Sequence, residues 1–304
     1  MRKSRKFNRK RLFRQRYLLL MSVPFVIWAF IFCYIPLWGW IMAFQEVKPA
    51  SLGMPFWKRT FIGFGNFTKV FSDRLFTQTL INTLAMSIIG IALSTITAIF
   101  LAVMLNELTM KGFKKFTQTV SYLPHFVSWV IVASIVKAFL NDGGVLDKVF
   151  GTNLHLMTTN SPVFWWVCVL VDVWKEMGWS AIIYLSAIAG IDKGLYGAAR
   201  VDGANRFQQI WHVTLPGIRS TVIVLLIMSI GGVLNVGMER QMLLSNGLVQ
   251  DHAMVLSWLS YERGIGNNNY GVGTAIGMFQ SLVGITLLLI ANKLAGKFGE
   301  EKLI

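Results

Sequence analysis

The sequence has few charged side chains and very few cysteines for its length. Asp, Glu, Lys and Arg make up 14% of the 304 residues, whereas a soluble domain carries about 25%. The two cysteines, Cys33 and Cys168, both lie in apolar runs. We interpret them as small buried hydrophobic residues, not as a disulfide or a metal pair. These shortages argue against a disulfide-stabilised secreted domain and against an ordinary soluble protein.

Motifs for catalysis, nucleotide binding and metal binding are also missing from the sequence. There is no G-x-x-x-x-G-K-[ST] segment that could hold phosphates. The four histidines are scattered, without a second histidine at helical spacing or cysteine partners. We therefore expect that the chain is not an enzyme, has no catalytic residue and no metal site, and binds no cofactor of its own.

Long apolar runs are what the sequence has in abundance. Hydrophobic residues make up 54% of the chain, and a run of about 18 apolar residues is long enough to cross a bilayer. We predict an all-α polytopic membrane protein with six transmembrane helices. Their expected ranges are 17–44, 79–105, 119–140, 163–190, 215–237 and 271–294.

The distribution of basic residues predicts the orientation of these helices. Lys and Arg number nine in 1–16 and three in each of 106–117, 192–214 and 293–304, eighteen in all, against eight on the opposite side. Basic residues concentrate on the cytoplasmic side of membrane proteins. We therefore expect a multi-pass protein of the plasma (inner) membrane with both termini in the cytoplasm.

The net charge of +15 does not indicate nucleic-acid binding. Nine of the 29 basic residues lie in the first sixteen positions, directly before an apolar run. Such a cluster fixes orientation and attracts anionic lipid headgroups. No folded basic domain or stacking motif accompanies it.

The predicted organisation is a membrane core with short polar extensions. It comprises a basic cytoplasmic tail (1–16), the first transmembrane helix with an external loop (17–78), a core of five helices (79–294), and a C-terminal tail (295–304). The segment 193–213 inside the core is polar and lies on the cytoplasmic side.

This polar segment is the most informative part of the chain. We predict two short helices around the Asp202-Gly203 break, with Gly203 at φ > 0 and Asp202 as the cap of the second helix. We expect Leu215-Pro216 to start the fifth helix and to join it stiffly to the segment. Small side chains would leave a flat surface for another protein, although an amphipathic surface helix without a partner would give a similar pattern. The small residues are Ala198, Ala199, Gly203 and Ala204.

Three short motifs at fixed spacing carry a family resemblance. Gly197-Ala198-Ala199, Asp202-Gly203-Ala204 and Leu215-Pro216 resemble the signature cytoplasmic loop of inner-membrane permeases from binding-protein-dependent ABC importers. The family consensus is Glu-Ala-Ala, then Asp-Gly-Ala, then Leu-Pro, so Gly197 stands where the family has an acid. The resemblance implies that these eight residues couple the chain to an ATPase, and that the fold is that of a type I ABC importer permease.

A second resemblance concerns the last apolar run. Tyr270–Gly284 and the Ala291-Asn292-Lys293 that follow are similar to the oligosaccharide branch of sugar permeases. Together the resemblances imply ATP-driven oligosaccharide import by alternating access, with ATP and Mg used by the partner ATPase. The implied partners are a second permease, two ABC ATPase subunits, an extracellular solute-binding protein and membrane lipid. An ion-coupled secondary transporter or a non-transporting membrane scaffold are the alternatives.

Polar residues inside the expected spans are candidates for the substrate pathway. Asp172, Lys175 and Glu176 share one helix face, where Lys175 can partly neutralise either acid. They would form a polar wall of a sugar cavity or a self-paired group at the membrane interface. Trp174 and Trp179 would stack on sugar or act as interfacial anchors. Asn235, Glu239 and the neighbouring Arg240 resemble a pathway region of related permeases.

Small residues recur along one face of the sixth expected span. Gly273, Gly277, Ser281 and Gly284 are spaced by four, four and three residues. A face of this kind lets two helices approach closely. We expect the approach to be made within the subunit, with a subunit interface as the alternative.

Overall fold

The computed structural model describes residues 15–151 and 155–297 of the chain. Within these ranges the regular structure is helical, apart from one isolated bridge between Gln45 and Phe61. The predicted all-α class is thus confirmed for the described part. Most of the expected basic tail and of the C-terminal tail, 1–14 and 298–304, lies outside the described residues.

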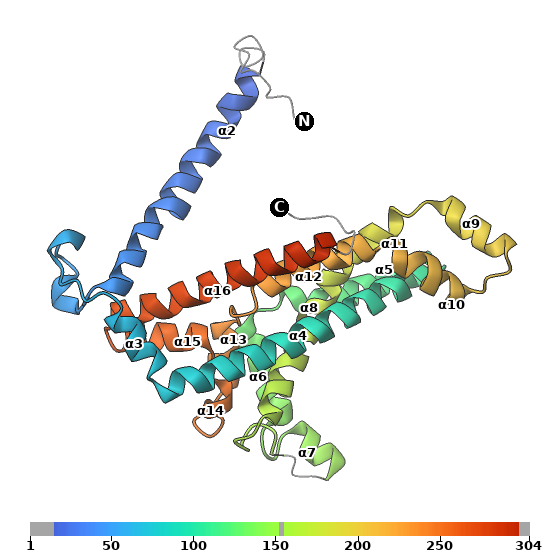
Figure 1. Cartoon of the computed structure of the whole chain (residues 1–304). Coiled ribbons are helices and arrows are strands. Elements are labelled where there is room, and N and C mark those ends of the chain that lie inside the picture. Colours follow the sequence, from blue (N-terminus) through green and yellow to red (C-terminus); the bar gives the residue numbers. More distant parts are fainter. Residues whose placement is uncertain (1–14, 152–154, 298–304) are drawn as a thin grey trace.

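The first apolar helix is long, and only its last part packs against other helices, where Ala43 is buried. Helix α2 (Arg16–Ala29) continues as a π-helical turn (Phe30–Tyr34) and a 3-10 helix (Ile35–Phe44). Figure 1 shows α2 projecting away from the other helices. Cys33 is exposed here, so our interpretation of it as buried is wrong, because no other described element covers this part of the helix. Cys168, by contrast, is buried as expected.

Three long helices form the frame of the bundle. They are α4 (Arg74–Glu107), α8 (Val163–Ala189) and α16 (Tyr270–Lys297). Figure 1 shows α4 running beside α8, with α16 on the far side of the bundle. The apolar side chains that face inward from these helices form the buried clusters of the core.

By length and composition, four described helices can cross a membrane. The number rises to five when two helices at the fifth expected span, 206–217 and 219–231, are counted as one bent span. The expected fourth span is α8, whose 27 residues extend about 40 Å. It is long and mostly apolar, but it is not among these helices because it carries three charged residues close together, Asp172, Lys175 and Glu176. The count of six spans stays a prediction.

The third expected span is interrupted in the middle. Helix α5 (Lys111–Tyr122) leads into a 3-10 turn (Leu123–Phe126), and α6 (Trp129–Leu140) follows after Ser128. The short α7 (Val145–Phe150) completes this part of the chain. Pro124 lies in the 3-10 turn, and it cannot donate the hydrogen bond that a continuous helix would need.

The fifth expected span starts earlier and ends earlier than the range 215–237. Helix α10 (Arg206–Gln209) runs through a π-helical turn (Ile210–Thr214) into α11 (Leu215–Gly217). The chain then bends by 56° before α12 (Arg219–Gly231). The expectation that Leu215-Pro216 starts the helix is therefore wrong. Proline removes a backbone donor and crowds the preceding turn, which favours a bend within a helix.

Five short elements connect the long helices on the side away from α10. They are α3 (Gly65–Phe71), α13 (Met238–Leu244), α14 (Gln250–Ala253), α15 (Leu256–Tyr261) and a π-helical turn (Glu262–Gly266). Two 3-10 turns, Pro49–Ser51 and Phe56–Lys58, lie in the loop after α2.

The small-residue face of α16 packs within the chain, as predicted. A Cβ placed on Gly273 would lie 2.5 Å from the Cα of Gly264, and one on Gly284 would lie 2.5 Å from the carbonyl oxygen of Gly231. Gly277, on the same helix, has nothing within 4 Å of that position. Glycine is therefore required at two of the four positions, where backbones meet.

Candidate functional site

The segment 193–213 forms two short helices joined by a tight turn. Helix α9 (Lys193–Val201) begins after Asp192, whose Oδ1 accepts a hydrogen bond of 2.9 Å from the backbone N–H of Gly194. Gly203 has φ +80°, as predicted. The expected cap is wrong, because Asp202 ends α9 instead of starting α10.

The cap of α10 is Asn205. Its Oδ1 accepts a hydrogen bond of 2.9 Å from the N–H of Gln208, and Gln208 Oε1 accepts one of 2.8 Å from the N–H of Asn205. This reciprocal pair satisfies two donors that a helix start leaves open. It fixes α10 directly after the turn at Gly203.

The two helices are attached firmly to the membrane bundle. The hydroxyls of Tyr196 in α9 and Thr214 before α11 lie 2.9 Å apart. A Cβ on Gly217 would come within 2.6 Å of Ile191 Cδ1, so the two ends of the segment touch. Beneath them, Ile188 and Ile218 belong to one buried cluster that also includes residues of α4. A displacement of α9 and α10 would therefore reach α4, α8 and α12 together.

Large apolar side chains protrude from the same helix pair. The exposed fractions are 54% for Leu195, 88% for Val201 and 73% for Phe207. Ala198 is also exposed, whereas Ala199 and Ala204 are half-buried. The surface around the motif is thus less flat than predicted, and more apolar. Large apolar side chains that stay exposed on a polar segment are typical of a surface that another protein covers.

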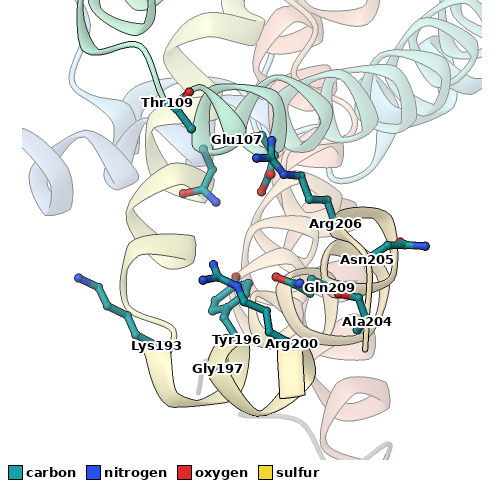
Figure 2. A pocket seen from close by; sticks show the side chains of 11 residues that line it. Glu107, Thr109, Lys193, Tyr196, Gly197, Arg200, Ala204, Asn205, Arg206 and Gln209 are labelled. Atoms are coloured by element: carbon teal, nitrogen blue, oxygen red, sulfur yellow. Dashed lines mark hydrogen bonds between the residues drawn. The ribbon is translucent and has the colours of Figure 1, made fainter. Parts of the chain in front are cut away.

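A cavity of about 890 Å³ opens between this helix pair and the end of α4. Figure 2 shows Arg206 extending from α10 toward Glu107, and Arg200 extending from α9 into the middle of the cavity. A Cβ on Gly197, which also lines the cavity, would meet nothing within 4 Å. The lining residues are Asn106, Glu107, Thr109, Lys193, Tyr196, Gly197, Arg200, Ala204, Asn205, Arg206 and Gln209.

A second cavity, of about 300 Å³, lies within the bundle between α4, α6, α8, α12 and α13. Hydroxyl and amide groups line much of it, including Ser94, Thr95 and Asn235. Ser87, also on its wall, donates a hydrogen bond to the carbonyl oxygen of Val233. These groups and one aromatic ring, Trp129, offer the contacts that a polar organic ligand needs.

An ion pair stands on the wall of this inner cavity. Asp172 Oδ1 lies 2.8 Å from Nη1 of Arg240, whose side chain is 7% exposed. The guanidinium lies 5.9 Å from the centre of the Trp129 ring, and its Nε has no hydrogen-bond partner among the described residues. The predicted neutralisation of Asp172 by Lys175 is therefore replaced by a pair with α13.

Lys175 and Glu176 face the interrupted third span instead. Lys175 Nζ lies 3.2 Å from Glu176 Oε1 and donates a hydrogen bond of 2.6 Å to the carbonyl oxygen of His125. Glu176 Oε2 is 2.6 Å from Nδ1 of His125. Trp179 stacks on the His125 ring, with centroids 4.5 Å apart. This cluster holds the break between α5 and α6 against α8.

The structure separates the predicted pathway residues into two groups. Asp172 and Asn235 line the inner cavity. Five others lie outside its wall: Trp174, Lys175, Glu176, Trp179 and Glu239. Sequence reasoning overlooked His125 and Trp129, which lie at the break in the third span. A histidine beside a proline in an apolar run was the available signal.

Comparison with protein families identifies this architecture. Residues 90–297 match the model of the family described as binding-protein-dependent transport system inner membrane component. The chain is 40% identical, over 98% of its length and 94% of the relative, to the polygalacturonan/rhamnogalacturonan transport system permease protein YteP of Bacillus subtilis (strain 168). It is also 40% identical to Protein LplB of the same organism, over 95% of the chain and 92% of LplB.

Solved structures agree with this assignment. A chain from the crystal structure of a bacterial ABC transporter involved in the import of the acidic polysaccharide alginate superimposes with a TM-score of 0.84 and 35% identity. The match covers 95% of this chain and 98% of the other. A chain from the crystal structure of a bacterial alginate ABC transporter in complex with alginate pentasaccharide-bound periplasmic protein superimposes with a TM-score of 0.85 and 34% identity. This match covers 97% of this chain and 99% of the other.

Proposed function

The chain belongs to the family of binding-protein-dependent transport system inner membrane components, and from this premise we propose that it moves an acidic oligosaccharide through the cavity beside Arg240. It is the permease subunit of an ABC importer and is not itself catalytic. ATP is used by the partner ATPase. The observation that carries the proposal is the firm attachment of α9 and α10 to the bundle that contains this cavity.

Coupling to ATP hydrolysis would use the helix pair as a lever. The ATPase would bind the exposed apolar side chains of the pair, among them Val201 and Phe207. Movement of α9 would pass through the Tyr196–Thr214 contact and the cluster around Ile218 into the bent fifth span. Exposing the inner cavity first to one side of the membrane and then to the other is alternating access. The eight motif residues at 197–199, 202–204 and 215–216 would form or support this surface.

The substrate class follows from the chemistry of the inner cavity. Arg240 is buried, and Asp172 occupies only one of its donor atoms, while Nε is free of partners in the described structure. Arginine binds carboxylates through paired donors. Trp129 supplies an aromatic surface beside it. One relative is named for polygalacturonan/rhamnogalacturonan transport, and one similar structure belongs to a transporter involved in the import of the acidic polysaccharide alginate. These names support an acidic sugar for this chain.

The remaining partners follow from the family and the relatives. One alginate transporter contains a sugar-loaded periplasmic protein, and this chain would accept sugar from an equivalent solute-binding protein outside the cell. A second, related permease and two ATPase subunits would complete the assembly. Both termini would lie in the cytoplasm.

The test is sugar uptake by the assembled importer in proteoliposomes with ATP enclosed. We expect uptake of an oligogalacturonate presented by its binding protein, and much less uptake of a neutral oligosaccharide of equal length. Arg240→Gln should lower oligogalacturonate uptake by about tenfold, because one good contact to a charged group corresponds to at least that factor.

Two outcomes would contradict the proposal. Uptake driven by a proton or sodium gradient without ATP would indicate a secondary transporter. Equal uptake of acidic and neutral sugars by the wild type and by Arg240→Gln would remove Arg240 from substrate recognition. The matched control is Arg59→Gln, since Arg59 donates hydrogen bonds within the external loop and lies outside the inner cavity.

A further inference from the structure

We propose that the cavity between α4, α9 and α10 receives an acidic side chain presented by the ATPase subunit. This inference rests on the proposed function, because it assumes that the ATPase binds the helix pair. It adds that the contact joins basic side chains of the permease to a carboxylate of the ATPase.

The charge of the cavity is the first argument. Three basic side chains and one acidic one line it: Lys193, Arg200, Arg206 and Glu107. Within the described residues, the guanidinium groups of Arg200 and Arg206 make no hydrogen bond or ion pair. Cations that share a cavity repel one another, and a carboxylate placed between them removes that repulsion.

The available space is the second argument. At about 890 Å³ the cavity is large enough for part of a loop. Gly197 contributes to this room, since nothing lies within 4 Å of the place where its Cβ would be. Arg200 follows Gly197 by three residues, so both lie on one face of α9. An acidic side chain of the partner could thus reach Arg200 through the space that a larger side chain at Gly197 would fill.

The surroundings of the cavity indicate a protein and not a small anion. Leu195, Val201 and Phe207 are exposed on the same two helices. Apolar side chains beside a charged pocket are typical of protein interfaces, in which hydrophobic contacts supply affinity and charges supply specificity. Figure 1 shows α9 and α10 at the opposite end of the bundle from α7 and α14, where a partner has free access.

Two probes distinguish binding of the ATPase at this surface from a contact with an acidic side chain of the ATPase. The first is a photoreactive amino acid in place of Val201, a residue that is 88% exposed. It captures the co-expressed ATPase whatever the charge of the contacting residue. The second is Arg200→Lys treated with a water-soluble carbodiimide. The reagent activates a carboxylate, the lysine Nζ displaces the activating group, and an amide forms only when an acid is in contact.

We expect both probes to link the chain to the ATPase, with the amide on an Asp or Glu of the ATPase. Arg200→Glu combined with Arg206→Glu should lower ATPase co-purification by at least about tenfold. Lys293→Glu combined with Lys297→Glu, the same change of charge on two exposed residues of α16 outside the cavity, should have no effect.

The outcomes that overturn the proposal are distinct from failure of the proposed function. Photocapture without an amide, together with unchanged co-purification of the double charge reversal, would leave docking intact and refute the acidic contact. Binding of the wild type to anionic lipid vesicles, lost in the double reversal while ATPase recovery persists, would assign the cavity to lipid headgroups. Absence of the ATPase from both photocapture and wild-type co-purification would contradict the proposed function itself.

Discussion

Two cations share one aromatic ring inside the bundle. Lys175 Nζ lies 5.4 Å and the Arg240 guanidinium 5.9 Å from the centre of Trp129. A charged side chain in hydrocarbon costs about 2.5–3.5 kcal/mol on insertion scales, and here each cation has its own acid. Arg240 pairs with Asp172, and Lys175 pairs with Glu176. The two pairs therefore have different roles. The Arg240–Asp172 pair lies on the wall of the inner cavity, and the Lys175–Glu176 pair stabilises the break in the third span.

Lys175 provides a prediction at this scale. Lys175→Met removes the donor to the His125 carbonyl oxygen, which lies at a helix break. We expect the free energy of unfolding, measured by detergent titration in mixed micelles, to fall by about 1–3 kcal/mol, the cost of an unsatisfied buried acceptor. Lys148→Met, at an exposed position in α7, is the control. Equal stability of the two variants would show that the cluster does not hold the break.

The partners of these residues could be inferred from the sequence only in part. We expected Lys175 to neutralise either Asp172 or Glu176, and the structure pairs it with Glu176. Asp172 was assigned the wrong partner, because Arg240 reaches it from α13 through tertiary packing. His125 was missed for the same reason. Its hydrogen bond to Glu176 depends on a helix break, which local patterns do not place.

Helix packing in this chain depends on single glycines at points of closest approach. Gly178 of α8 is one example, since a Cβ there would lie 1.9 Å from the carbonyl oxygen of Ser121 in α5. Gly284 in α16 meets α12 in a similar way. Contacts of this kind fix helix pairs at short distance, which is the usual means of packing in membranes.

Helix α16 contains its own matched pair for a prediction. Gly284→Ala should force the backbone at Gly231 to move, whereas Gly277→Ala enters open space. We expect Gly284→Ala to lower stability by about 1–3 kcal/mol, the usual cost of overpacking, and Gly277→Ala to leave it within about 0.5 kcal/mol. Thermal unfolding of the two purified variants in one detergent measures the difference. Similar losses for both would indicate that Gly277 contacts a partner subunit.

Apolar runs predicted where long helices lie, but not where they bend. The ranges around α4, α8 and α16 were close to the structure because length and hydropathy decide them. The break near Pro124 and the bend after Pro216 were missed. We took Pro216 as part of a helix start, which proline also favours, and only the packing of neighbouring helices distinguishes a start from a bend.

At the scale of the molecule, the charge pattern and the exposed apolar surface both bear on how the chain lies in the membrane. The cytoplasmic segments expected from the basic residues include α9 and α10, which carry the family motif. The first span, Arg16–Phe44, has no buried residue in its most apolar window, so lipid or another subunit must cover it. The predicted orientation depends on charges alone, and it decides whether the helix pair can meet an ATPase.

Cysteine labelling tests that orientation in whole cells. Val201→Cys in α9 and Val149→Cys in α7, each combined with Cys33→Ser, place one exposed thiol at opposite ends of the bundle. Because basic residues remain in the cytoplasm, a membrane-impermeant maleimide should label Val149→Cys in intact protoplasts and Val201→Cys only after lysis. Labelling of Val201→Cys in intact protoplasts would place the helix pair outside the cell. An ATPase in the cytoplasm could then drive no movement of α9, and the coupling mechanism would be wrong even though the fold is right.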